Sequence, residues 1–429
     1  MDTEDQQHSP LRANKKFRFL CIGSIISMLG DQLTLITLPW LALFLSPEPW
    51  VVGSVMAVMA LPMSVFMLFG GVIVDRYSAK RILLLSKYFN GILMALLAIL
   101  IYNDLLTLPW LYLIVFLIGT YSAFAIPAGS SLLPQIVHPT ELPIANSIGM
   151  SLRSLTTIIG PLLAAVLLAV EFSNLNETKG AQPANLTLIF IIDAASFFIS
   201  AYLLKFIDIP TTKTKEPGSI KQNILLGFQH FWSLKDLRLL MFYIALVTSF
   251  LGGLMQVGIP LLVNNQWQGG AELFGILMAM FAVGNIIGMF VAAKSAITRY
   301  LTLGLCVLLT DIIVGVLLMV MSRVSEVWQG TIILMLMGVL AGFVQVIFIS
   351  WVQQQAKREL LGRLMSIVMF GLVGLLPLGT ALAGAVLQFV PVSSFFLVSG
   401  FALSIIALLA MCFSDIPSVK SARLPLQQN

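Results

Sequence analysis

Long apolar runs separated by short polar breaks make up most of the chain. Roughly twelve of these runs reach the ~20 residues that an apolar helix needs to cross a bilayer. A helix satisfies its backbone hydrogen bonds within one segment, as lipid requires, so each run predicts a transmembrane helix. The predicted spans are residues 17–45, 50–73, 82–101, 109–127, 144–170, 186–206, 238–263, 272–293, 300–321, 328–350, 364–389 and 393–413.

One long polar stretch, residues 208–236, divides the series between the sixth and seventh spans, and it combines prolines, a glycine and several lysines. Like features recur on both sides of it, as in transporters built from repeats. The sequence therefore predicts an all-α integral membrane protein with twelve transmembrane helices in two pseudo-symmetric six-helix halves. Its predicted parts are an N-terminal tail (1–16), an N-terminal half (17–207), a linker (208–236), a C-terminal half (237–414) and a C-terminal tail (415–429).

Composition and charge agree with a membrane protein. The chain is 59% hydrophobic and 10% charged, with a mean hydropathy of +0.98, which excludes an ordinary soluble domain. The net charge of +5 arises from bases in the tail and in alternate loops, so it indicates two cytoplasmic termini rather than a nucleic-acid partner. Phosphate-binding loops, zinc motifs and catalytic triads are missing from the sequence, which predicts no enzyme activity, no cofactor and no metal.

Asp31, near the middle of the first span, is the leading functional candidate. A charged Asp at the bilayer centre costs about 2.5 to 3.5 kcal/mol on insertion scales, which favours a role in a proton or substrate pathway. We therefore predict that Asp31 couples transport to protons, with Gln32 beside it. The alternative is a structural acid satisfied by Gln32, Thr34 or a neighbouring helix.

Arg153 is the base that the sequence places deep within a span, in the fifth helix. A guanidinium there needs an acid or a water-filled cavity, and Asp31 and Asp193 are the acids of the same half. We assign Arg153 to the coupling and substrate site together with Asp31. The alternative is an arginine that extends along its helix to the aqueous edge.

Secondary candidates are weaker. Asp311 is a candidate second titrating site with Thr310 as its polar neighbour, although the sequence gives no physical reason for an acid in this span. The neutral polar residues of the second half line a cavity or form interhelix hydrogen bonds; they are Gln256, Asn285 and Gln345.

The stretch GGVIVDRYSAKR, residues 70–81, ends the second span at a cluster of charges. It resembles the signature loop between the second and third helices of the major facilitator superfamily, although Ser78 and Ala79 depart from that pattern. The resemblance implies a gate that locks one access state, with Arg363 across the halves. The gating residues are then Gly71, Asp75, Arg76, Lys80, Arg81, Gly362 and Arg363.

Further segments are similar to a branch of that superfamily containing macrolide-efflux and enterobactin-exporter-like proteins: SIISMLGDQLTLITLPW from Ser24, the stretch from Ile126, IIDAASFFISAYLL from Ile191, and KRELLGRLMS from Lys357. The resemblance implies that Asp193, in the segment from Ile191, makes a structural contact. The predicted helix kinks are Pro39, Gly160 and Pro161. The last two resemble the antiporter motif of exporting facilitators, which continues with Gly-Gly where this chain has Ala164 and Ala165.

The resemblance implies a monomeric secondary transporter of the bacterial inner membrane. Its expected partners are protons, the lipid bilayer and a bulky, partly apolar small molecule, either a macrolide-like drug or a siderophore, which it exports. One alternative is an importer or a lysolipid flippase without proton coupling. The other is a membrane receptor or scaffold that transports nothing.

Overall fold

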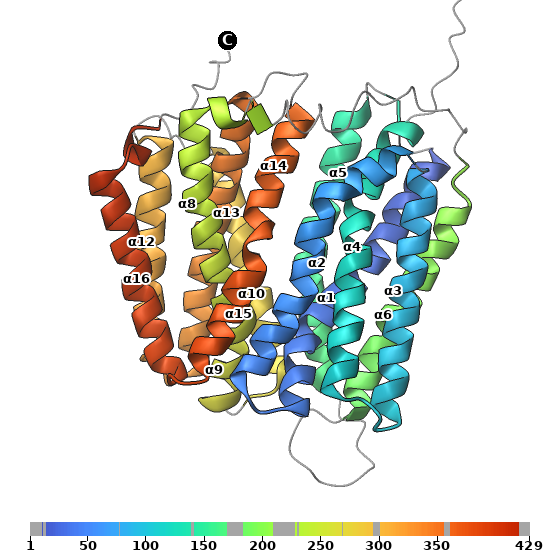
Figure 1. Ribbon diagram of the computed structural model, residues 1–429, viewed down its shortest axis with the longest axis horizontal. Coiled ribbons are helices and arrows are strands. Elements are labelled where there is room, and N and C mark those ends of the chain that lie inside the picture. Colours follow the sequence, from blue (N-terminus) through green and yellow to red (C-terminus); the bar gives the residue numbers. More distant parts are fainter. Residues whose placement is uncertain are drawn as a thin grey trace, which may run out of the picture. The chain divides into compact units, whose positions relative to one another are not determined.

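The computed structural model describes residues 11, 14–76, 78–138, 141–169, 183–208, 228–229, 231–267, 269–294, 301–355 and 361–419. All regular elements among these residues are helical (Figure 1). Twelve helical stretches in this part of the chain are long and apolar enough to cross a membrane. The predicted fold class, an all-α membrane protein with twelve spans, is confirmed.

The helices form two compact units: unit 1 takes in the described residues among 1–46 and 58–217, and unit 2 takes in those among 47–57 and 218–429. Five helices lie wholly in unit 1, and α2 (Pro49–Arg76) contributes most of its length to it. The five are α1 (Lys15–Leu45), α3 (Ala79–Tyr102), α4 (Leu108–Ile136), α5 (Leu142–Ala169) and α6 (Pro183–Lys205).

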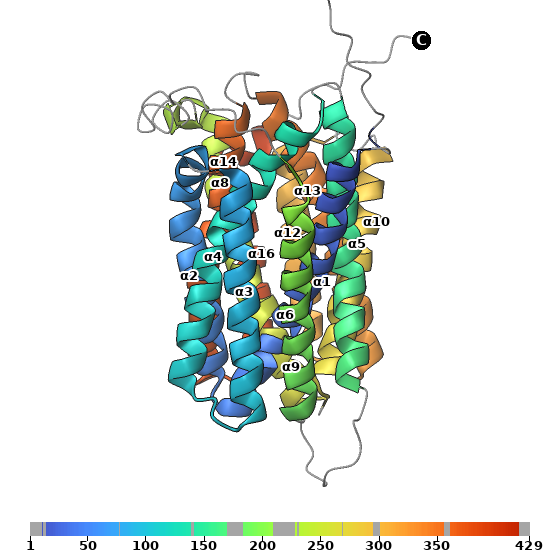
Figure 2. The same ribbon diagram turned by 90° about the vertical axis from the view of Figure 1, so that its right-hand side faces the viewer.

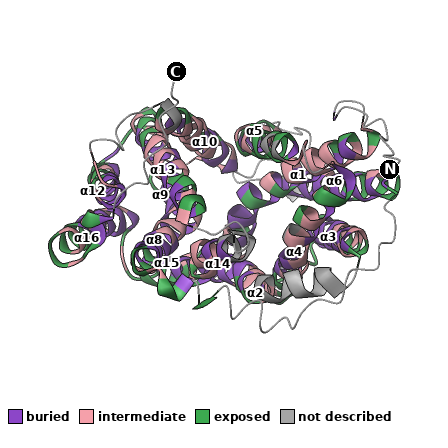
Figure 3. Cartoon of the chain, turned by 90° about the horizontal axis from the view of Figure 1, so that it is seen from above, coloured by how far each residue is buried: buried purple, intermediate pink, exposed green. Residues whose placement is uncertain are grey.

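Unit 2 contains the remaining helices, which are α8 (Lys235–Gly253), a π-helical turn (Leu254–Gly258), α9 (Ile259–Asn265), α10 (Ala271–Lys294), α12 (Leu303–Met321), α13 (Val327–Gln355), α14 (Leu361–Gly374), α15 (Leu376–Leu387) and α16 (Val392–Phe413). A short 3-10 turn, Ile416–Ser418, follows α16. Within this unit α10 packs along α13 and α12 packs along α16 (Figure 3).

Three helices differ from the predicted spans. The fourth continues through Pro127 to Ile136, beyond the predicted end at residue 127. The eleventh is interrupted at Leu375, since Pro377 occupies the first turn of α15 and cannot continue the hydrogen-bond ladder of α14. The seventh contains the π-helical turn just before Pro260. Proline therefore interrupts the eleventh helix, follows a π-helical turn in the continuous seventh helix and is accommodated within the fourth.

Glycines set the separation of α10 and α13. Gly284 and Gly288 of α10 lie against the backbone of α13, and Gly338 and Gly342 of α13 lie against the backbone of α10. A Cβ at any of the four would overlap a main-chain carbonyl or amide of the facing helix. This reciprocal four-residue spacing, which we call the glycine seam, is how membrane helices achieve close van der Waals packing.

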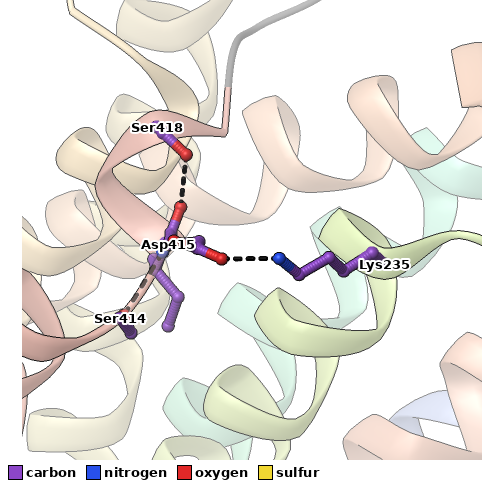
Figure 4. A network of polar contacts seen from close by, with 5 residues as sticks. Lys235, Ser414, Asp415 and Ser418 are labelled. Atoms are coloured by element: carbon purple, nitrogen blue, oxygen red, sulfur yellow. Dashed lines mark hydrogen bonds and ion pairs between the residues drawn. The ribbon is translucent and has the colours of Figure 1, made fainter.

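The segment after α16 closes one end of unit 2. Thr302, the N-cap of α12, accepts a hydrogen bond from the Leu305 amide (3.2 Å) and donates one to the Pro417 carbonyl (2.5 Å). The Gly304 amide donates to the Val419 carbonyl (3.3 Å). Lys235, at the start of α8, forms an ion pair with Asp415 at 2.7 Å (Figure 4). The segment thus connects α8, α12 and α16.

We expect Asp415→Asn to leave the melting temperature of the purified protein unchanged at neutral pH. The two side chains are 69% and 64% exposed, and exposed ion pairs contribute little. Lys235 holds the pKa of Asp415 below its usual value, so any stability from the pair is present at neutral pH and lost as the pH falls through that lowered pKa. A lower melting temperature at neutral pH that returns to the wild-type value in acid would contradict this expectation.

Candidate functional site

Four residues of α1 form a stripe that organises unit 1. Ser27, Gly30, Asp31 and Thr34 follow the spacing of one helical face. Gly30 lies against the carboxyl of Asp193 and the hydroxyl of Ser196, both on α6, and a Cβ at position 30 would overlap them. Figure 2 shows α3 and α6 of this unit from the side. The stripe therefore brings α1 close enough to α6 for polar side chains to meet.

Asp193 lies at the centre of this contact and is fully buried. The Thr34 hydroxyl donates to Asp193 Oδ2 at 2.5 Å. The Ser196 hydroxyl lies 3.1 Å from Asp193 Oδ1 and 2.7 Å from the Asp193 carbonyl oxygen. The sequence analysis offered Thr34 as a partner for Asp31, but the structure gives its hydroxyl to Asp193.

Lys87 of α3 is a second base in the spans of unit 1, and the sequence analysis did not single it out. Its Nζ donates to the Ser27 hydroxyl at 2.8 Å and lies 5.9 Å from the centre of the Phe197 ring. The side chain is half-buried and lies within electrostatic range of both Asp31 and Asp193. The sequence signal was present: Ser27 and Asp31 are one turn apart, so a cation bound at one is close to the other.

Asp31 and Arg153 are both exposed. The guanidinium of Arg153 and the ammonium of Lys87 both lie within electrostatic range of the Asp31 carboxylate. Within the described residues, Asp31 forms neither a direct hydrogen bond nor an ion pair of 4 Å or less. Its carboxylate is thus surrounded by cations from α3 and α5 without being fixed by either.

Gly160 and Gln32 hold α5 against α1 beside this carboxylate. A Cβ at Gly160 would overlap the Gln32 side chain, so the two helices are in close contact there. Arg153 precedes Gly160 by about two turns and shares its face of α5. The kink candidates Pro39 and Pro161 are buried inside α1 and α5, which are each continuous through them.

Asp311 lies in unit 2 and has a partner that the sequence did not suggest. Tyr243 of α8 donates its hydroxyl to Asp311 Oδ2 at 2.8 Å, and both residues are buried. Thr310, the expected neighbour, instead donates to the Cys306 carbonyl at 2.8 Å. The pair connects α8 to α12 and explains how a carboxyl is accommodated in this helix.

Replacing Tyr243 with Phe should destabilise unit 2 by about 1 to 3 kcal/mol, the cost of leaving a buried polar group without its partner. Thermal unfolding of the purified protein would measure this. Tyr102→Phe is the matched control, because Tyr102 is 76% exposed at the end of α3. Equal melting temperatures for Tyr243→Phe and Tyr102→Phe would show that the buried hydrogen bond contributes nothing.

The neutral polar candidates of unit 2 are separate from one another. Gln256 is half-buried in the π-helical turn, a type of turn that is frequent at functional sites. Asn285 is half-buried, with its backbone against Gly338 and Gly342 in the glycine seam. Gln345 is exposed on α13. Of the three, Gln256 remains the best placed for a functional role.

The gating candidates fall largely outside what the structure describes. Gly71, Asp75 and Arg76 belong to the last turns of α2, and Gly362 and Arg363 to the first turn of α14, but the side chains of these residues lie outside the described set. Lys80 donates to the Lys205 carbonyl at 3.1 Å, which connects the start of α3 to the end of α6. Arg81 is exposed. The gate therefore stays a prediction.

A separate apolar hollow of about 520 Å³ lies between α3 and α6. Small and apolar side chains line it, including Ala95, Ala98, Ala194 and Ala195. Charged side chains are missing from its described lining, and none of the candidate residues reaches it. We therefore keep the charged cluster of unit 1, rather than this hollow, as the candidate site.

In the described part of the chain, twelve helices are long and apolar enough to cross a membrane, and charged side chains inside them indicate a membrane transporter. The sequence profile described as Major Facilitator Superfamily matches residues 20–376. The chain therefore belongs to the Major Facilitator Superfamily, as the loop at residues 70–81 predicted.

Two curated relatives are transporters by name. The chain is 28% identical over 422 residues to the enterobactin exporter EntS of Salmonella paratyphi A. This alignment covers 94% of the present chain and 93% of EntS. It is 24% identical over 375 residues to the staphyloferrin A transporter of Staphylococcus aureus. That alignment covers 85% of the present chain and 88% of the relative. The predicted resemblance to the enterobactin-exporter-like branch is confirmed.

Solved structures support the same fold. A bacterial homologue of the iron transporter ferroportin, in an inward-facing state, matches with a TM-score of 0.69 and 17% identity, covering 94% of this chain and 99% of the homologue. The nucleoside transporter NupG matches with a TM-score of 0.65 and 14% identity over 92% of this chain and 98% of NupG. At these identities the matches establish the fold alone.

Proposed function

We propose that this transporter exports a bulky, partly apolar small molecule of the siderophore class in exchange for protons. The observation that carries the proposal is the Asp31 carboxylate, exposed in the middle of α1, with Lys87 of α3 and Arg153 of α5 in electrostatic range. An acid at this position is costly to insert and marks a proton or substrate pathway.

The surroundings of Asp31 suit a group that changes its protonation state during transport. Asp31 makes no direct hydrogen bond to the described residues, so its exposed carboxylate is open to a proton or a substrate group. A proton or a charged substrate group can compete with the neighbouring cations for this carboxylate. Competition between a proton and a charged substrate group at this group of charges would couple their opposite movements.

The substrate class is inferred from the relatives. EntS is named as an exporter of enterobactin, and the staphylococcal protein is named as a transporter of staphyloferrin A. We extend the siderophore class to this chain and retain a macrolide-like drug as the second candidate. We also propose that the protein is a monomer of the bacterial inner membrane, and that both termini are cytoplasmic, as the distribution of Lys and Arg predicts.

Transport into inside-out membrane vesicles tests the proposal. Vesicles with and without the protein receive an imposed proton gradient together with enterobactin, staphyloferrin A or a macrolide. We expect a siderophore to accumulate only in vesicles that contain the protein, and a protonophore to abolish the accumulation. Accumulation that survives the protonophore would refute proton coupling. Movement of a lysolipid in the absence of siderophore transport would favour a flippase instead.

A further inference from the structure

The hydroxyl groups around Asp193 can satisfy either of its protonation states. Each hydroxyl carries a single proton to donate. Thr34 Oγ1 has two acceptors, Asp193 Oδ2 at 2.5 Å and the Met94 sulfur at 3.6 Å. Ser196 Oγ also has two, Asp193 Oδ1 at 3.1 Å and the Asp193 carbonyl oxygen at 2.7 Å.

Protonation therefore requires rotation of hydroxyl groups alone. When Asp193 is ionised, Thr34 and Ser196 both donate to its carboxylate. When Asp193 is protonated, its O–H donates to Thr34 Oγ1, while Thr34 turns to the weak acceptor of Met94 and Ser196 turns to the carbonyl oxygen. The site can thus bind and release a proton while its heavy atoms stay in place.

Asp193 can take up one proton without leaving a carboxylate charge uncompensated. Asp31 of α1 and Lys87 of α3 are the charged groups that act on Asp193 among the described residues. Arg153 of α5 acts on Asp31, and both Asp31 and Arg153 are exposed, so water screens these two charges. With all four groups ionised their charges sum to zero. A proton on the buried Asp193 leaves Lys87 to compensate Asp31, so a buried carboxylate charge is compensated in either state.

Lys87 is held where it can compensate either carboxylate. Its ammonium has three donors, of which one is used by the Ser27 hydroxyl at 2.8 Å. A cavity of about 10 Å³ beside it has room for roughly one water molecule. The cavity is lined by Phe19, Leu20, Gly23, Ser24, Ser200 and Leu204.

We propose that Asp193, Asp31 and Lys87 form an intramembrane cluster that carries one exchangeable proton, with Asp193 as its binding site and Lys87 as a positioning residue. The proposal rests on the proton-coupled function above and adds the place where the proton resides. Asp193 then serves transport directly instead of only joining α1 to α6, and the cluster implies one proton per transport cycle.

Infrared titration of the purified transporter in lipid nanodiscs tests the assignment. A protonated carboxylic acid has a carbonyl stretching band that a carboxylate lacks. We expect this band in the wild type and its loss in Asp193→Asn, while the matched control Asp311→Asn should keep the Asp193 band. Identical spectra for wild type and Asp193→Asn at every pH would overturn the proposal.

Lys87 variants separate a positioning role from a structural one. Without the nearby cation, the Asp193 band in Lys87→Met should persist to a pH about one to three units higher. Lys87→Arg keeps the charge and should titrate like the wild type. An unchanged titration in Lys87→Met would overturn the role of Lys87.

Thr34→Val is the milder variant, because it removes one hydroxyl and no charge. Thr34→Val removes a hydrogen-bond donor to the ionised carboxylate, so the Asp193 band should persist to a higher pH than in the wild type. An unchanged titration would count against the proposal. If the band titrates as expected but transport into vesicles does not depend on the proton gradient, the proposed function is wrong and the proton site stands. If transport is proton-driven and Asp193 has no titrating band, only this inference fails.

Discussion

Asp31→Asn should leave the protein folded and remove its proton-driven export. The amide keeps the volume of the carboxyl and eliminates its charge, so Arg153 loses its carboxylate neighbour and Lys87 is left with Asp193 alone. Coupling between two ligands is typically worth about 1 to 3 kcal/mol, a factor of about 5 to 150. We expect siderophore accumulation in inside-out vesicles to fall by a factor in this range.

Two variants control for the Asp31 experiment. Asp31→Glu retains a titrating carboxyl and should keep part of the coupling. Asp104→Asn makes the same chemical change on the exposed loop after α3, where Asp104 has a φ of 55° that asparagine also adopts readily, and it should transport like the wild type. Accumulation by Asp31→Asn against the gradient would instead make Asp31 a structural acid.

Gly30→Ala should disrupt the site more severely than its small size suggests. The new methyl group would overlap the Asp193 carboxyl and the Ser196 hydroxyl, which Thr34 and the α6 backbone hold in place. Overpacking of this kind costs about 1 to 3 kcal/mol. Because α1 must move away from α6, we also expect transport to be lost along with stability.

Gly149→Ala and Gly129→Ala are the matched controls. Both glycines lie in helices of unit 1, and a Cβ at either position meets nothing within 4 Å. Each should match the wild type in melting temperature and transport, with a small gain in stability from the better helix propensity of alanine. A Gly30→Ala protein as stable and active as Gly149→Ala would show that α1 and α6 tolerate separation.

Hydropathy predicts the spans because each segment must by itself be apolar enough for lipid and must satisfy its own backbone hydrogen bonds there. The ends and interruptions of helices depend on more than local composition. The small and polar residues after Pro127 end the apolar run, although α4 continues to Ile136. The apolar pattern also does not distinguish Pro377, which starts a new helix, from Pro39, which lies within one.

The chemistry of the candidate site was less predictable, because it depends on which helices meet. Asp31 and Arg153 are visible in the sequence as charges inside spans. Lys87 lies near the start of its span and resembles an ordinary basic residue at a membrane edge, until its contact with Ser27 is known. Likewise, the hydrogen bond from Tyr243 to Asp311 joins helices far apart in the chain, and no local pattern predicts it.

The glycine seam between α10 and α13 predicts where natural variants of this protein will be scarce. Every single-base change in a glycine codon that alters the amino acid without ending the chain adds at least a Cβ. At Gly284, Gly288, Gly338 and Gly342 that atom would overlap main-chain atoms of the other helix, which cannot rotate away as a side chain can. Among functional alleles, we therefore expect a substitution at one of these codons only alongside a second change in the facing helix.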